Sequence, residues 1–131
     1  MESTRAVELV EAFWREVWNA ADPGAVDRFV TDDFVITNAG RDIVGREAFK
    51  TWIAAFLAEL PDLRLTVIET FANADGSRVA SRWRITGTNN GYHHTAAIGD
   101  QISFTGTAVW QVSEDGKLLH NWVERSAPVA A

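Results

Sequence analysis

Two arginines on one predicted strand are the first candidates for chemistry. The alternation of residue types predicts a strand over residues 78–88, with Arg82 and Arg84 on one face and Trp83 and Ile85 on the other. A guanidinium on such a face could bind a substrate carboxylate or the oxygen of an enolate. The alternative is a solvated or subunit-facing strand surface.

The carboxylate of Glu69 and the amide of Asn121 are further candidates, each with a structural alternative. Glu69 is in register with Leu65 and Val67, on the apolar side of its strand. There its pKa would be raised and it could act as an acid or base, unless a local bulge turns it to water. The amide of Asn121 could donate a hydrogen bond to a developing oxyanion, although it cannot act as a general base. The structural alternative is an amide whose hydrogen bonds are satisfied within the core.

The three histidines lack the spacing of a metal site. His93 and His94 are neighbours in an expected loop, where adjacent extended residues point apart, and His120 lies on the last predicted strand. We therefore favour one histidine acting as an acid or base over a zinc site, and His94 is the preferred candidate. The chain also has no glycine-rich phosphate loop, nucleophile elbow or HExxH motif. We therefore expect neither a metal nor a cofactor.

The composition excludes several classes of function. The chain has 131 residues, a formal net charge of −6 and no cysteine, so we expect one domain over residues 1–131 without disulfides. An acidic chain without a basic run argues against nucleic acid or an anionic membrane as partner. No apolar run approaches the ~18–20 residues of a membrane span, and acidic residues occupy the place of a secretory signal. We expect a cytoplasmic protein with a small-molecule partner.

Aromatic residues are the unusual part of the composition, because six tryptophans occur in this short chain. Each taken alone is better explained by core packing than by ligand binding. Together they could line a cavity for a flat aromatic or polycyclic ligand, since stacked rings gain ~0.5–1.5 kcal/mol per pair beyond burial. The aromatic candidates for substrate binding are Trp14, Trp18, Phe34, Trp52, Phe56 and Trp110.

Hydrophobic periodicity predicts helices first and strands afterwards. The expected helices cover residues 7–18, a short segment from Asp22-Pro23 to Val30, and residues 46–60. The expected strands cover residues 34–37, 63–73, 78–88, 102–112 and 117–124, followed by a frayed tail over 126–131. This order predicts an α+β fold in which three N-terminal helices close a curved antiparallel sheet. The open mouth of such a cone, beside the loop over residues 90–100, is a natural pocket.

Several segments, in order along nearly the whole chain, resemble the SnoaL-like polyketide cyclases of the nuclear-transport-factor-2-like superfamily. They are Asp32-Asp-Phe, Gly45-Arg-Glu-Ala-Phe, Arg78-Val-Ala-Ser-Arg-Trp-Arg-Ile-Thr-Gly-Thr, Ile102-Ser-Phe-Thr-Gly and Asp115-Gly-Lys-Leu-Leu-His-Asn-Trp. The resemblance implies a cone-shaped, cystatin-like fold, usually a homodimer. It also implies cofactor-independent cyclase or hydroxylase chemistry of the kind used in antibiotic biosynthesis. More distant relatives include epoxide hydrolases, ketosteroid isomerase and binding domains.

Two positions depart from the pattern that this resemblance implies. The family's acid on the last strand falls on Val123, and a pocket histidine falls on Trp110. Asn121 shares the face of Val123, whereas Glu124, the nearest carboxylate, should face the opposite side unless a bulge re-aims it. Arg82 matches a basic position common in the family.

The leading hypothesis is a cofactor-independent enzyme acting on a polyketide-like aromatic or polycyclic molecule. In it, Arg82 and Asn121 hold the oxygen where enolate charge develops, Glu124 or His94 moves the proton, and Val123 contacts the substrate. The alternatives are a non-catalytic binding or dimerisation domain of the same fold and, ranked lower, an epoxide hydrolase or isomerase. The outer face of the sheet is mixed enough to pair with a second copy.

Overall fold

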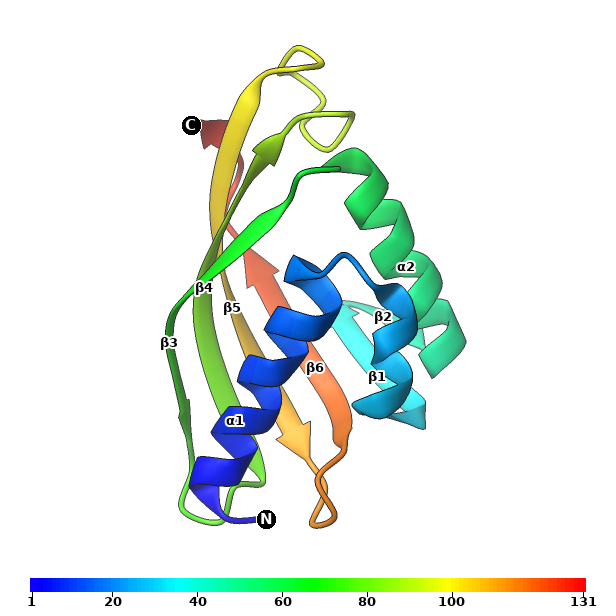
Figure 1. Ribbon diagram of the computed structural model, residues 1–131, viewed down its shortest axis with the longest axis vertical. Helices are drawn as coiled ribbons and strands as arrows, with labels where there is room; N and C mark the ends of the chain where they lie inside the picture. Colours follow the sequence, from blue (N-terminus) through cyan, green and yellow to red (C-terminus); the bar gives the residue numbers. More distant parts are fainter.

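A strongly bent sheet with helices packed on its concave face forms the molecule (Figure 1). The computed structural model describes residues 1–131. The helical elements are α1 (Ser3–Phe13), a π-helix (Trp14–Asn19), a 3₁₀-helix (Pro23–Arg28) and α2 (Arg46–Glu59). The strands are β1 (Val30–Asn38), β2 (Arg41–Val44), β3 (Arg64–Ala72), β4 (Arg78–Thr88), β5 (Gln101–Val112), β6 (Leu118–Arg125) and β7 (Val129–Ala130). The α+β prediction of a curved sheet with N-terminal helices is confirmed.

The N-terminal helix changes its winding where its tryptophans begin. Glu2 accepts a hydrogen bond from the backbone N–H of Arg5, which caps α1, and the chain passes directly from α1 into the π-helix. Trp14 is buried against Trp83 and Trp110 of the sheet, and Trp18 is buried against Trp52 and Phe56 of α2. The next helix begins with Pro23 as expected, but it is a 3₁₀-helix and the side chain of Asp22 does not cap it. The prediction of a capping aspartate is therefore wrong.

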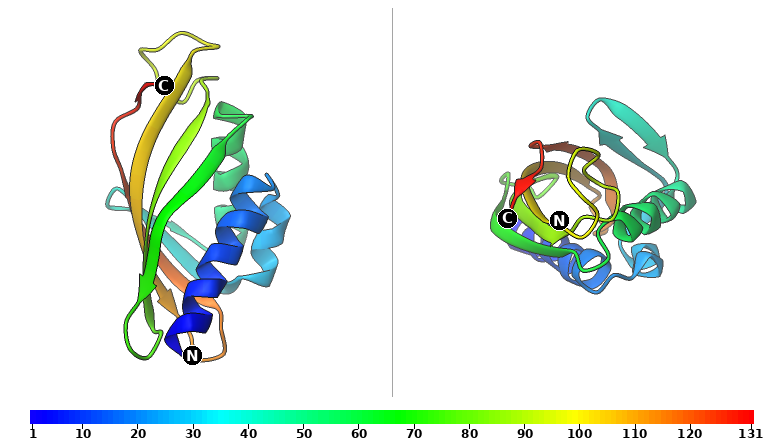
Figure 2. Two further views of the ribbon diagram at one scale, coloured as in Figure 1. Left: turned by 60° about the vertical axis from the view of Figure 1, so that its left-hand side comes forward. Right: turned by 90° about the horizontal axis from the view of Figure 1, so that it is seen from above.

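The sheet has the order β2-β1-β6-β5-β4-β3, and β7 pairs with β5. The strands from β3 to β6 form the expected antiparallel meander. However, β1 is longer than predicted and runs parallel to β6, so the sheet is not wholly antiparallel. The tail is not frayed, because Val129 and Ala130 pair with Ser103 and Ile102. Seen from above, the sheet curls around the space that the helices close (Figure 2).

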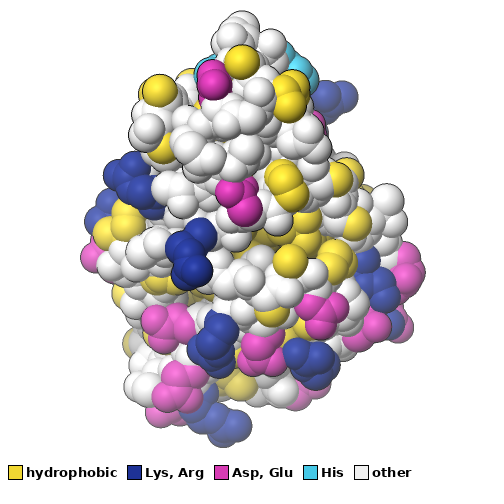
Figure 3. Space-filling view, turned by 45° about the horizontal axis from the view of Figure 1, so that its top comes forward, with side chains coloured by type: hydrophobic (Ala, Val, Ile, Leu, Met, Phe, Trp, Pro, Cys, Tyr) yellow, Lys and Arg dark blue, Asp and Glu magenta, His cyan; other side chains and the backbone are white.

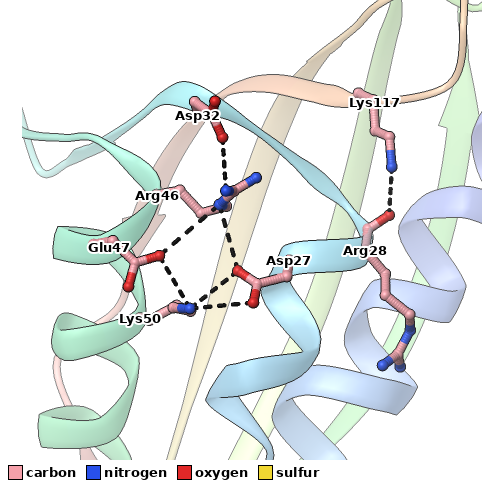
Figure 4. Close-up of polar contacts among 7 residues, drawn as sticks. All are labelled: Asp27, Arg28, Asp32, Arg46, Glu47, Lys50 and Lys117. Carbon is pink, nitrogen blue, oxygen red and sulfur yellow. Dashed lines mark hydrogen bonds and ion pairs between the residues drawn. The ribbon is translucent and has the colours of Figure 1, made fainter.

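Charged residues tie the 3₁₀-helix, β1 and α2 together on the outside of the core (Figure 4). The Arg46 guanidinium lies 2.6 Å from a carboxylate oxygen of Asp32 and 3.4 Å from one of Asp27. The Lys50 ammonium lies 3.0 Å from both Asp27 and Glu47, and these two hydrogen bonds raise the pKa of Lys50. This network fixes the position of α2, which forms one wall of the site described next. No helix in the structure has both the length and the apolar character needed to cross a membrane.

Candidate small-molecule site

A small cavity lies between the helices and the concave face of the sheet. Apart from Asn121 and Arg125, all of its lining residues are hydrophobic. The enclosed space is about 20 Å³, and the non-atom space is about 330 Å³ when the opening to solvent is counted. Apolar side chains gather near the middle of the face shown in Figure 3. The lining residues are Trp14, Trp18, Ile36, Phe49, Trp52, Phe56, Leu65, Trp83, Ile85, Asn121, Val123 and Arg125.

Aromatic rings fill most of the interior. The ring centre of Trp14 lies 5.6 Å from that of Trp110 and 5.8 Å from that of Trp83, and Trp18 packs edge-on against Trp52 at 6.0 Å. An enclosed space of about 20 Å³ holds one water molecule, since a water needs ~10–15 Å³ by this measure. The interior as it stands therefore has no room for a polycyclic ligand, which would lie in the open part of the site.

The sequence-predicted aromatic residues divide into two sets. Trp14, Trp18, Trp52 and Phe56 line the cavity together with Val123, and their role in binding a substrate stays a prediction. Phe34 and Trp110 do not line it, because both pack deeper in the core. The ring of Phe34 contacts Phe49 at 4.6 Å and Trp110 at 6.3 Å.

Asn121 brings a polar atom without a partner into the cavity wall. The residue is 3% exposed, and its Oδ1 atom accepts no hydrogen bond. The indole N–H of Trp83, another lining residue, is also buried and unpaired, whereas that of Trp14 donates to Ser81 at 3.1 Å. An unpaired buried polar group costs ~1–3 kcal/mol. A ligand that hydrogen-bonds there would recover this cost.

Arg125 closes the outer end of the cavity. Its guanidinium lies over the rings of Trp52 and Phe56, 5.7 Å and 5.2 Å from their centres. It donates a hydrogen bond to the Asn38 side-chain oxygen at 2.5 Å, and no carboxylate lies within 4 Å of it. The side chain is thus a partly buried cation held by neutral groups.

Tyr92 completes this end of the site from the loop between β4 and β5. Its ring stacks on Phe104 at 4.8 Å and contacts Phe56 at 5.1 Å. Burial raises the pKa of Tyr92, although the neighbouring Arg125 acts in the opposite direction. The phenol is therefore protonated at neutral pH and can donate a hydrogen bond. We call Asn38, Trp52, Phe56, Tyr92 and Arg125 the mouth cluster.

Sequence reasoning missed Asn38, Tyr92 and Arg125. A signal for Arg125 was present, because it lies two residues after Val123 and alternation places both on the same face of β6. The position of Tyr92 was harder to predict. It depends on buried Asn89, whose amide donates to the carbonyls of His93 and Ala96 and so folds the loop.

The structure does not bring the predicted catalytic residues together. Arg82 lies on the outer face of the sheet, where its Nε atom is 2.8 Å from a carboxylate oxygen of Glu69. A bulge between Val67 and Glu69 turns that carboxylate outward, which is the alternative that the sequence left open. Glu124 is also exposed on the outer face. Arg82 and Asn121 therefore lie on opposite sides of the sheet and cannot hold the same oxygen.

The histidines occupy three separate environments. His94 is exposed in the loop, and His93 lies within hydrogen-bond distance of Thr95. His120 lies 2.8 Å from the hydroxyl of Thr37 and stacks on Trp122, and burial lowers its pKa. No group of three or more His, Cys, Asp or Glu side chains is placed to hold a metal ion.

The sequence profile of the SnoaL-like domain matches residues 10–121. The chain belongs to the SnoaL-like domain family. This is the family that the sequence motifs implied. No curated protein sequence matches the chain at a significant level.

Solved structures share the SnoaL-like fold over most of the chain. A protein from Jannaschia sp. CCS1, named as a SnoaL-like polyketide cyclase, superimposes with a TM-score of 0.81 at 18% identity, covering 95% of this chain and 87% of its own. SalBIII, an epoxide hydrolase/cyclase-like enzyme of pyran ring formation in salinomycin, superimposes with a TM-score of 0.81 at 20% identity. The match covers 98% of this chain and 97% of SalBIII. An LEH-like epoxide hydrolase of M. tuberculosis superimposes with a TM-score of 0.72 at 20% identity. The match covers 95% of this chain and 84% of the hydrolase. At these identities the likeness shows the fold.

This SnoaL-like chain differs from the acid chemistry that the resemblance implies. Val123, at the implied acid position, does line the cavity, so the position faces the site but carries no ionisable group. Neither a carboxylate nor a histidine lines the cavity elsewhere. The polar groups available to a ligand are the amide of Asn121, the guanidinium of Arg125, the phenol of Tyr92 and indole N–H groups.

Proposed function

We propose that this SnoaL-like protein is a cofactor-independent enzyme acting on a polyketide-like aromatic small molecule, with cyclase- or hydroxylase-like chemistry. The observation that carries the proposal is the pair formed by a cation, Arg125, and a protonated phenol, Tyr92, at the apolar mouth of the cavity. Both groups donate hydrogen bonds. Both would stabilise negative charge on a carbonyl oxygen as an enolate forms.

The proposed chemistry is electrostatic, because no general base lines the cavity. Water at the open end of the site takes the proton from the substrate carbon, and Arg125 and Tyr92 hold the resulting enolate oxyanion. In a cyclase, the enolate carbon then bonds to a second carbonyl carbon of the substrate, whose oxygen takes a proton back from water. A hydroxylase would in addition need dioxygen as the oxidant. Asn121 lies four residues from Arg125 along β6, a separation of about 13 Å in an extended strand. It therefore binds the inner end of the substrate and not the same oxygen.

A non-catalytic binding domain is the second candidate. The absence of a carboxylate or histidine among the lining residues favours it. It predicts ligand affinity without turnover. An epoxide hydrolase or isomerase would need a carboxylate beside Arg125, and the cavity wall has none.

Turnover without added cofactor separates the two candidates. Purified protein is incubated with a panel of anthracycline-type ring precursors, and products are followed by liquid chromatography and mass spectrometry. The enzyme proposal expects at least one precursor to be converted faster than in buffer. Tight binding with unchanged precursors throughout the panel would overturn it and support the binding domain.

We also propose that a second copy of the chain covers the outer face of the sheet. Phe71, Val109 and Trp122 are 55%, 38% and 37% exposed and lie in one row across the strands. The adjacent row carries both signs of charge, including Arg82 and Glu124. A face with apolar and oppositely charged rows is complementary to itself when rotated by a two-fold axis.

A further inference from the structure

We propose that Arg125 is a specificity-determining residue that selects ligands with an anionic oxygen, and that these ligands are one- or two-ring aromatic acids with a hydroxyl group at the opposite end. This inference rests on the proposed function, because it concerns the ligand of the same site. It requires only binding, and so it holds for either an enzyme or a binding domain.

Arg125 has no carboxylate partner, unlike Arg46 and Lys50; Lys117, also partly buried, has none either and donates to the backbone carbonyl of Arg28. Arg46 and Lys50, whose side chains are 30% and 22% exposed, each lie within 4.0 Å of at least two carboxylates. Arg125 is also partly buried, but its neighbours are the oxygen of Asn38, the phenol of Tyr92 and two aromatic faces, all of them neutral. A partly desolvated guanidinium without a counter-ion is a binding site for a carboxylate, which it can hold through two hydrogen bonds.

The opposite end of the cavity presents a hydrogen-bond acceptor. Asn121 is nearly fully buried and its Oδ1 atom lacks a donor. A ligand hydroxyl group would supply that donor. Since Asn121 and Arg125 lie on the same face of β6 with Val123 between them, the ligand has its anionic end outward and its hydroxyl end inward.

The available space sets the size of the ligand. The enclosed space of about 20 Å³ holds one water molecule, so most of a ligand would lie in the open part of the site. The rings of Trp18 and Trp52, whose centres lie 6.0 Å apart, form part of the cavity wall. The rings of a ligand would therefore lie at the opening, beside lining residues such as Phe56 and Val123, and this small site favours one or two rings over a fused four-ring molecule.

Direct binding measurements test this inference. Isothermal titration calorimetry at pH 7.5 compares 6-hydroxy-2-naphthoic acid with its neutral carboxamide and with 2-naphthoic acid, which lacks the hydroxyl group. We expect the hydroxy acid to bind at least tenfold more tightly than the carboxamide and several-fold more tightly than 2-naphthoic acid. The variant Arg125→Gln should lose the preference for the acid, and Arg125→Lys should retain part of it. Arg84→Gln, on the outer face, is the matched control and should bind like the wild type.

Equal affinity for acid and carboxamide in the wild type would overturn the inference, and this result does not depend on any variant. So would a tight complex of the acid with Arg125→Gln. If none of the naphthalene probes binds while larger ring precursors are converted, the inference fails and the proposed enzyme stands. If the acid is selected but no precursor is converted, the inference stands and the enzyme proposal fails.

Discussion

The guanidinium of Arg125 lies 5.2 Å from the ring centre of Phe56, so the last long strand of the sheet and helix α2 meet across the mouth of the cavity. This contact sets a positive charge against an apolar wall. Because Arg125 is partly buried, its interaction with an anionic ligand is screened less than that of a fully exposed arginine.

Tyr92 should make the protein sensitive to alkali. Burial raises the pKa of its phenol above the usual value, so the folded state keeps the proton while the unfolded chain loses it. The neutral phenol thus contributes stability below about pH 10, the ordinary value for tyrosine, and this contribution is lost as the pH rises further. Urea unfolding of the wild type and Tyr92→Phe between pH 8 and pH 11 measures it. The variant should lose less stability above pH 10; identical pH profiles would contradict the assignment.

Asn121→Leu should stabilise the protein while weakening its function. The change removes an acceptor that has no donor and replaces it with an apolar side chain of similar size. We expect the free energy of unfolding to rise by about 1 kcal/mol, and affinity for a hydroxylated ligand to fall about tenfold. Thermal and urea unfolding check the first effect and calorimetry the second. A destabilised variant would show that the amide is satisfied in the folded protein.

The ion pairs of Arg46 at the junction of the 3₁₀-helix, β1 and α2 should contribute to the stability of the fold, and this contribution should depend on salt. Arg46→Met removes ion pairs to Asp27 and Asp32 and should lower the free energy of unfolding by about 1 kcal/mol at low ionic strength. The difference should shrink in 1 M sodium chloride, because salt screens the pairs. Arg41→Met, a change to an exposed arginine without an ion pair, is the control. An equal loss of stability in both variants would show that the ion-pair network does not stabilise the fold.

The proposed dimer predicts that Val109→Glu is monomeric. A carboxylate in the exposed apolar row would be buried next to Trp122 in the interface, which is unfavourable without a partner. Sedimentation equilibrium of the wild type should give twice the chain mass, and the variant should give the chain mass. Ile98→Glu, in the loop between β4 and β5, should remain dimeric. A monomeric wild type would rule out the interface.

Residue alternation predicted the faces of the strands correctly. It placed Asn121 and Val123 on one side of the last strand and Glu124 on the other, as observed. It also placed Arg82 opposite Trp83. Because Trp83 is buried, Arg82 had to face outward, and the family resemblance that made it a catalytic candidate pointed to the wrong side of the sheet.

Features that depend on pairing between distant segments could not be read from the sequence. The bulge that exposes Glu69 arises from the register between β3 and β4. The parallel pairing of β1 with β6 joins segments about 85 residues apart, and periodicity contains no information on it. The mouth cluster likewise combines β1, α2, β6 and a loop, so it is visible only once these elements are assembled.

The central claim is that the site lies on the inner face of the sheet at Arg125 and not on the outer face at Arg82. The most direct test is the steady-state kinetics of Arg125→Gln and Arg82→Gln on whichever ring precursor the wild type converts, after both variants are shown to be folded by circular dichroism. We predict that Arg125→Gln lowers kcat/KM about 100-fold, the cost of removing one oxyanion donor, while Arg82→Gln retains the wild-type value. A loss confined to Arg82→Gln would contradict the account.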